Sequence, residues 1–71
     1  MNRINPKKLL NSKWTAVTPI NKEKHFFVAE VEFDEDGMVI HCLIEAVMSK
    51  NMYSIDWTDL KNTEQWKQGW K

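Results

Sequence analysis

The chain has 71 residues, ten Lys and Arg side chains against ten Asp and Glu side chains, and one cysteine. We expect one small Trp-rich domain over residues 1-71, close to the lower size limit for folding without disulfides or a structural metal ion. A single cysteine excludes an internal disulfide, and no group of Cys and His has the spacing of a zinc site. We therefore expect no metal and no cofactor, and a core built from aromatic and aliphatic side chains.

The charge is balanced overall but unevenly distributed. Residues 1–29 are mainly basic, whereas residues 30–47 carry only acidic charges. No apolar run approaches the roughly 20 residues of a membrane span, and the first ten residues lack a secretory pattern. These features predict a cytoplasmic protein with no membrane partner.

A short N-terminal helix is predicted over residues 5–10. Asn5 is a favourable N-cap, and Pro6 suits the first helical position. A helix of about two turns is not stable alone, so Leu9 and Leu10 are expected to dock on a sheet.

A first strand is predicted over residues 14–18, which are mainly aromatic and β-branched. Pro19 is expected to end this strand. Residues 21–24 then read as a polar loop.

The centre of the chain reads as a β-hairpin over residues 25–48, with Asp36-Gly37 at its turn. A two-residue turn at Glu35-Asp36 sets Phe33 opposite Met38. A turn at Asp36-Gly37 shifts the pairing by two residues and keeps the same faces.

Alternation along both arms of the hairpin assigns one face to the core. That face carries the following residues: Phe27, Ala29, Val31, Phe33, Met38, Ile40, Cys42, Ile44, Ala46 and Met48. The other face keeps apolar residues, including Phe26 and Val28, among charged ones. A helix, the C-terminal tail or a second copy of the chain is expected to cover part of it.

A fourth strand follows a turn at Lys50-Asn51, with Met48 opposite Tyr53. Thr58 is expected to begin a short helical turn. Thr63 then caps a helical segment that would set Trp66 and Trp70 side by side.

The predicted fold is therefore α+β. It is a four-stranded antiparallel β-meander, with curling of the sheet as an open alternative. A short N-terminal helix and a short helical C-terminal Trp segment cover one face.

Two stretches, at residues 5–17 and 57–70, resemble a family of small bacterial tryptophan-rich proteins classed as conserved hypothetical. The quoted motifs are Asn5-Pro6-Lys7-Lys8-Leu9-Leu10-Asn11-Ser12-Lys13-Trp14-Thr15-Ala16-Val17, Lys22-Glu23-Lys24-His25-Phe26, Trp57-Thr58-Asp59-Leu60 and Trp66-Lys67-Gln68-Gly69-Trp70. The resemblance implies a domain of unknown function, with no assigned activity, cofactor or site.

One pair of residues could support acid–base chemistry. Glu30 and His41 fall opposite each other in one register, and a carboxylate can raise the pKa of an imidazole. No nucleophile or glycine-rich loop accompanies them, so we predict no catalytic residues and a protein that is not an enzyme.

The basic and aromatic ends provide the candidate binding surface: Lys7, Lys8, Lys13, Trp14, Trp66, Lys67 and Trp70. Trp is enriched in protein-binding hot spots, which favours a non-enzymatic protein-interaction module with an unidentified partner protein. The alternative is single-stranded nucleic-acid binding, in which Trp stacks on bases and Lys attracts phosphates. Buried Trp that simply close the core, and a homodimer, are further alternatives.

Overall fold

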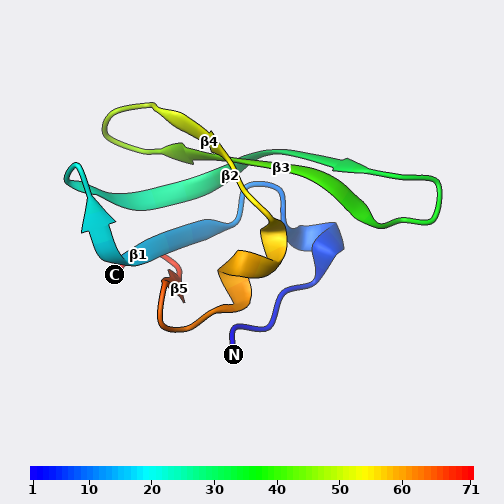
Figure 1. The fold of residues 1–71 in the computed structure, drawn as a ribbon, viewed down its shortest axis with the longest axis horizontal. Helices are drawn as coiled ribbons and strands as arrows, with labels where there is room; N and C mark the ends of the chain where they lie inside the picture. The colour runs from blue at the N-terminus through cyan, green and yellow to red at the C-terminus, as the bar shows by residue number, and fades with distance from the viewer.

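The computed structural model describes residues 1–71 and contains one five-stranded antiparallel sheet of strand order β4-β3-β2-β1-β5 (Figure 1). Its strands are β1 (Lys13–Ile20), β2 (Glu23–Phe33), β3 (Val39–Ala46), β4 (Met52–Ser54) and β5 (Trp66–Gln68). The only helical elements are two 3-10 turns, η1 (Pro6–Lys8) and η2 (Trp57–Lys61). The prediction of a four-stranded α+β fold is therefore wrong, because both terminal segments form less helix than expected and one of them forms a strand.

The N-terminal segment forms a single 3-10 turn instead of a two-turn helix. Asn5 caps it as predicted, since its side-chain oxygen accepts a hydrogen bond of 3.0 Å from the Lys7 amide. Leu9 is fully buried, whereas Leu10 remains half exposed. Asn11, with φ 67°, adopts the left-handed conformation at which the chain turns toward β1.

A two-residue turn joins β1 to β2 and replaces the predicted polar loop. Asn21 and Lys22 have φ of 57° and 64°, and Ile20 pairs with Glu23. Positive φ at both central residues is the requirement of a type I′ hairpin turn, which suits the twist of antiparallel strands. Pro19 does not end the first strand, because β1 continues through it to Ile20.

The predicted central hairpin is confirmed, but the alternation that places residues of β2 on the core face is interrupted along the strand. Val28 pairs with Ile44 and Val31 pairs with Cys42, which leaves Ala29 as an extra residue in β2. This β-bulge lets Val28 and Val31, three residues apart, lie on one face of the sheet.

The predicted core face of the hairpin is correct from Cys42 to Ala46 in β3 but wrong at Ile40. In β2 it is wrong before the bulge and correct at Val31, which packs against the core. Cys42, Ile44 and Ala46 are buried as expected. Before the bulge in β2 the buried apolar residues are Phe26 and Val28, which were assigned to the opposite face. The bulge explains this result, since one extra residue reverses the alternation between the two halves of the strand.

Both turns of the hairpin region are longer than predicted. The Asp34 amide donates to the Met38 carbonyl oxygen, which encloses a three-residue loop ending at Gly37 with φ 81°. Beyond β3, Tyr53 pairs with Ile44 instead of Met48. This slip of four residues keeps the predicted faces, because it is an even number.

The C-terminal Trp segment is a strand and not a helix. Trp66 pairs with Ala16 along the free edge of β1, and Asp56 rather than Thr58 caps η2. Trp66 and Trp70 therefore belong to an extended segment and not to one helical turn. Gly69, with φ 79°, reorients it between them.

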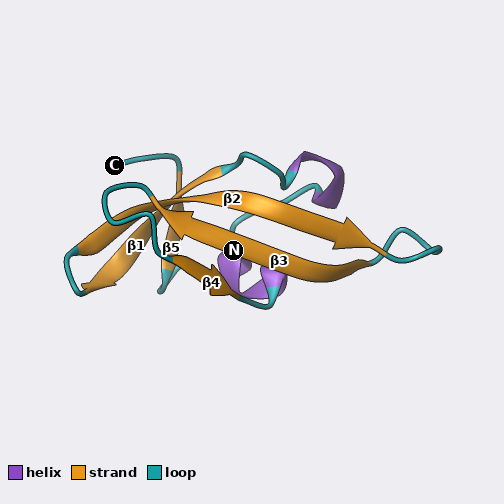
Figure 2. Ribbon diagram, turned by 90° about the horizontal axis from the view of Figure 1, so that it is seen from above, coloured by secondary structure: helices purple, strands orange, loops and turns teal.

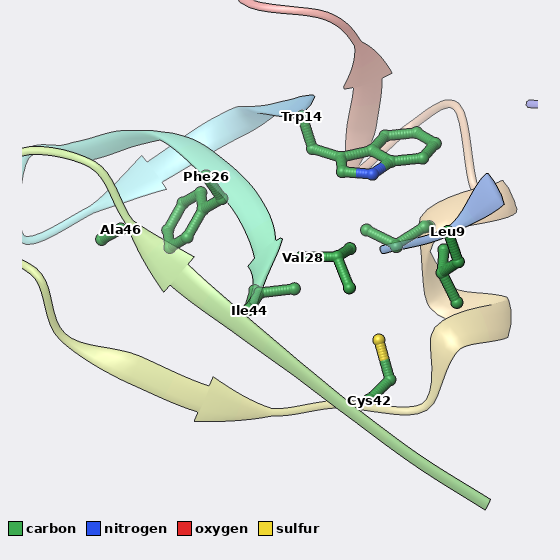
Figure 3. Packing of buried hydrophobic residues seen from close by; sticks show 8 residues of the cluster. Leu9, Trp14, Phe26, Val28, Cys42, Ile44 and Ala46 are labelled. Atoms are coloured by element: carbon green, nitrogen blue, oxygen red, sulfur yellow. The ribbon is translucent and has the colours of Figure 1, made fainter. Parts of the chain in front are cut away.

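The core lies between the sheet and the two 3-10 turns, which cover the same side of it (Figure 1). Figure 3 shows Trp14 above Leu9, with Val28 and Cys42 directed toward the same space. The buried apolar residues are Leu9, Trp14, Phe26, Val28, Cys42, Ile44, Ala46 and Leu60. No helix in the structure is long and apolar enough to cross a membrane.

The outer part of the β2–β3 hairpin extends beyond the other strands (Figure 2). Phe33, Met38 and Ile40 on this arm are 43%, 62% and 63% exposed. These three residues belonged to the predicted core face. None of them packs against the core. A second register shift, between Glu32–His41 and Phe33–Val39, leaves Ile40 as an extra residue, and Val39 packs against the core in its place.

Candidate functional site

A groove of about 650 Å³ lies beside the β1–β2 turn, and we call it the aromatic groove. Its lining residues are Ala16, Thr18, Ile20, Asn21, Glu23, Phe26, Ile44, Tyr53, Ser54, Ile55, Glu64, Gln65 and Trp66. Small-molecule and side-chain binding sites commonly have volumes of about 300–1,000 Å³. The groove is therefore large enough to accept a ligand or the side chains of a partner.

Three aromatic rings form the walls of the groove. The Phe26 ring lies between Tyr53, at a centroid distance of 6.2 Å, and Trp66, at 5.3 Å. Both ring pairs have edge-to-face geometry, with interplanar angles of 65° and 83°. Edge-to-face pairs are favourable, so the rings hold each other in place. β2, β4 and β5 each contribute one ring, so the groove exists only when the sheet is complete.

A buried carboxylate stands at one end of the aromatic groove. Glu23 is 7% exposed and accepts hydrogen bonds from the hydroxyl of Ser49, from Asn51 Nδ2 at 3.2 Å and from Tyr53 Oη at 2.5 Å. These bonds, that from Ser49 first, hold the pKa of the Glu23 carboxyl below its ordinary value of 4.5. The same contact raises the pKa of the Tyr53 hydroxyl. Glu23 is therefore a fixed anion held by neutral donors.

The seven residues of the predicted binding surface do not form one surface. Trp14 is 2% exposed, so it is a core residue and cannot stack on a base. Trp66 is half-buried in the aromatic groove, and the exposed Lys7 and Lys8 lie in η1. Trp14 is therefore unavailable for stacking, and no Lys lines the groove that contains Trp66.

Three residues of the predicted set do lie on one face of the sheet, opposite the core. The Lys13 ammonium lies 4.8 Å from the centre of the Trp70 ring, and Trp70 is 45% exposed. Lys67 is opposite Thr15, two residues after Lys13, and therefore projects from the same face.

The C-terminal tail covers part of this far face. The Thr15 hydroxyl donates to the Gly69 carbonyl oxygen at 2.7 Å and accepts from the Lys71 amide at 2.9 Å. Trp70 Nε1 donates to the Phe26 carbonyl oxygen at 3.0 Å. Thr15 is consequently 2% exposed.

The predicted acid–base pair is present as a surface contact. His41 Nε2 lies 3.5 Å from Glu30 Oε2, although His41 pairs in the sheet with Glu32. A small hollow of about 210 Å³ beside His41 is also lined by Cys42 and Asp56. Burial, together with Asp56, raises the pKa of the Cys42 thiol to about 11. The thiol is therefore protonated near neutral pH and is a poor nucleophile.

No group of three or more His, Cys, Asp or Glu side chains is arranged to hold a metal ion. Apart from Trp66, the residues of the aromatic groove were missed by sequence reasoning, and Glu23 was assigned to a loop. Asn21 was the one available signal, since Asn tolerates the left-handed conformation of a type I′ turn. No pattern in the sequence indicates that Glu23 contacts Ser49, Asn51 and Tyr53, which lie 26 to 30 positions further along the chain.

The comparisons with known proteins give one result. The family model described as Tryptophan-rich protein (DUF2389), a family of unknown function, matches residues 12–71. This match confirms the resemblance to a tryptophan-rich family of unknown function. No curated protein and no solved structure matches the chain.

Proposed function

We propose that this chain, which belongs to the Tryptophan-rich protein family (DUF2389), is a non-enzymatic module that binds a partner protein through its aromatic groove. The observation that carries the proposal is the groove itself: three aromatic walls from three strands, open to solvent above a buried carboxylate. Aromatic side chains in a partly desolvated depression are typical of protein-binding hot spots.

The ionisable groups favour binding over catalysis. A general acid or base works best with a pKa close to the operating pH. The pKa of Glu23 is lowered, and the pKa of the Cys42 thiol is raised to about 11. Both shifts move these groups away from neutrality, so neither is suited to exchanging protons or attacking a substrate at that pH.

Selection of random displayed peptides on the immobilised protein tests the proposal. A Thr18→Trp variant should lose the selected peptides, because Thr18 is an exposed groove residue and a Trp side chain there would fill the space. Ile40→Trp is the matched control, since Ile40 is an exposed strand residue on the hairpin arm. Equal binding to wild type and to Thr18→Trp would overturn the groove as the binding site.

Single-stranded nucleic-acid binding is the second candidate, now limited to the far face of the sheet. Lys13, Lys67 and Trp70 are its remaining residues, and the contact of Lys13 with the Trp70 ring supports it. Base stacking and phosphate attraction should give binding that weakens as salt rises. A fluorescence titration with mixed single-stranded DNA and RNA should then show quenching that Trp70→Ala abolishes and Thr18→Trp leaves unchanged.

A further inference from the structure

We infer that the aromatic groove receives a cationic side chain, Lys or Arg, from the partner polypeptide. The inference rests on the proposed function and adds the chemical class of the group that is bound. Its first basis is the charge of the lining: Glu23 and Glu64 are its charged residues, and the groove contains no Lys, Arg or His.

Neither carboxylate of the groove is neutralised within the chain. Glu23 accepts only from the neutral groups of Ser49, Asn51 and Tyr53. The one ion pair in the structure joins His41 to Glu30, on the hairpin arm. The groove therefore keeps an unpaired negative charge at its buried end and a second one, from the exposed Glu64, at its rim.

The aromatic walls add a second, independent attraction for a cation. An ammonium or guanidinium group is attracted to the face of an aromatic ring within about 6 Å of its centre. The Phe26 ring stands nearly perpendicular to Trp66 and steeply inclined to Tyr53, so the rings present faces and edges in several directions around one space. Rings in this arrangement resemble the walls of the aromatic cages that bind cationic ligands.

The shape of the groove also suits Lys or Arg. Both side chains carry an apolar stem that packs on hydrophobic surface while the charged head reaches a polar environment. In the groove the stem would contact Ile55 and the aromatic rings, and the head would lie in the field of Glu23 and Glu64. The chain itself offers an example of this pairing, since the Lys61 ammonium lies 4.6 Å from the centre of the Trp57 ring.

Two matched probes isolate the charge. Amide and indole NMR signals of the ¹⁵N-labelled protein would be followed during titration with Nα-acetyl-lysine amide and, separately, with Nα-acetyl-norleucine amide. The two probes have similar stems, and only the lysine probe is charged. We expect saturable shifts at Trp66 and Tyr53 with the lysine probe, and clearly weaker binding of the norleucine probe.

Variants of the full chain then test the carboxylates. Glu64→Gln should weaken the lysine probe by about twofold to fivefold, the range of an exposed charge contact. Glu32→Gln removes the same charge from the hairpin arm and should leave binding unchanged. Glu64 is exposed and its side chain has no hydrogen-bond partner, so the variant should keep the fold, and retained signal dispersion would verify this.

The outcomes distinguish this inference from the proposed function. Equal affinity for both probes would overturn the cationic inference while leaving an apolar binding groove. The absence of groove shifts with the lysine probe would also overturn it, and the peptide selection would still decide whether the groove binds protein. Selected peptides without Lys or Arg would contradict the inference in the same way.

Discussion

The inner and outer halves of the β2–β3 hairpin have similar sequence patterns but differ in the burial of their apolar side chains. In the inner half, Val28 and Ile44 are almost completely buried, whereas Ile40 in the outer half is 63% exposed. The pairing shifts between Glu32–His41 and Phe33–Val39, which leaves Ile40 as an extra residue of β3, and Val39 packs against the core instead. Alternation of apolar residues therefore indicates which face could be buried only as far as the next irregularity in the strand pairing.

The largest expected effect comes from the same substitution at two positions of β3. Ile44→Ala should destabilise the protein by about 2–5 kcal/mol, since it removes packed atoms and leaves a cavity. Ile40→Ala should change stability by no more than about 0.5 kcal/mol, the usual range for an exposed site.

Urea denaturation measures both variants, provided that the slope of the free energy of unfolding against urea is unchanged. Similar losses at the two positions would show that something covers the outer arm in solution. That result would contradict the difference in burial between the inner and outer halves of the hairpin.

The second-largest expected effect concerns Glu23, the buried carboxylate that lines the aromatic groove. Because the pKa of Glu23 is lower in the folded protein than its ordinary value of 4.5, ionised Glu23 stabilises the fold above that pH. This contribution should decline as the pH falls below 4.5 and through the folded-state pKa. Thermal unfolding between neutral pH and strongly acidic pH would follow it.

Glu23→Gln should lower the melting temperature at neutral pH, and the difference from wild type should narrow in acid. Tyr53→Phe is a graded comparison, because it removes one of the three donors and keeps the carboxylate. A Glu23→Gln curve parallel to the wild-type curve at every pH would show that the hydrogen bonds do not favour the ionised form.

The smallest expected effect concerns the reactivity of the single cysteine thiol. This reactivity reports local opening of the structure around it. Cys42 is 1% exposed in the inner half, and burial raises the pKa of its thiol to about 11. A thiol reagent such as Ellman's reagent should therefore react slowly with the native protein and fully in urea. An Ile40→Cys variant should gain one fast-reacting thiol on the outer arm. Fast reaction of the wild-type thiol would mean that the inner half opens readily.

Much of the sheet could be predicted from sequence because its signals are local. Asp36-Gly37 and the alternation beside it identified the hairpin, and Asn5-Pro6 located the N-terminal turn. The Ala29 bulge could not be predicted, since a single extra residue leaves the composition of the strand unchanged while reversing its faces.

The C-terminal strand shows a different limit of sequence reasoning. Trp66 and Trp70 have a spacing that fits one helical turn, but the open edge of β1 offers this segment backbone hydrogen bonds as a strand. Tertiary pairing overrides local spacing there, and the same pairing places Trp66 in the aromatic groove. The groove therefore depends on contacts between distant segments, which spacing alone does not reveal.

The attachment of β5 to β1 has a consequence for how the protein is made. Asn2 Nδ2 donates to the carbonyl oxygens of Leu60 and Trp66, the latter 64 residues further along the chain. During synthesis, which proceeds at about 5–20 residues per second, the edge of β1 stays unpaired until β5 has left the ribosome. An open strand edge is a template for wrong pairing. β5 thus completes the sheet and closes the edge through which nascent chains would associate.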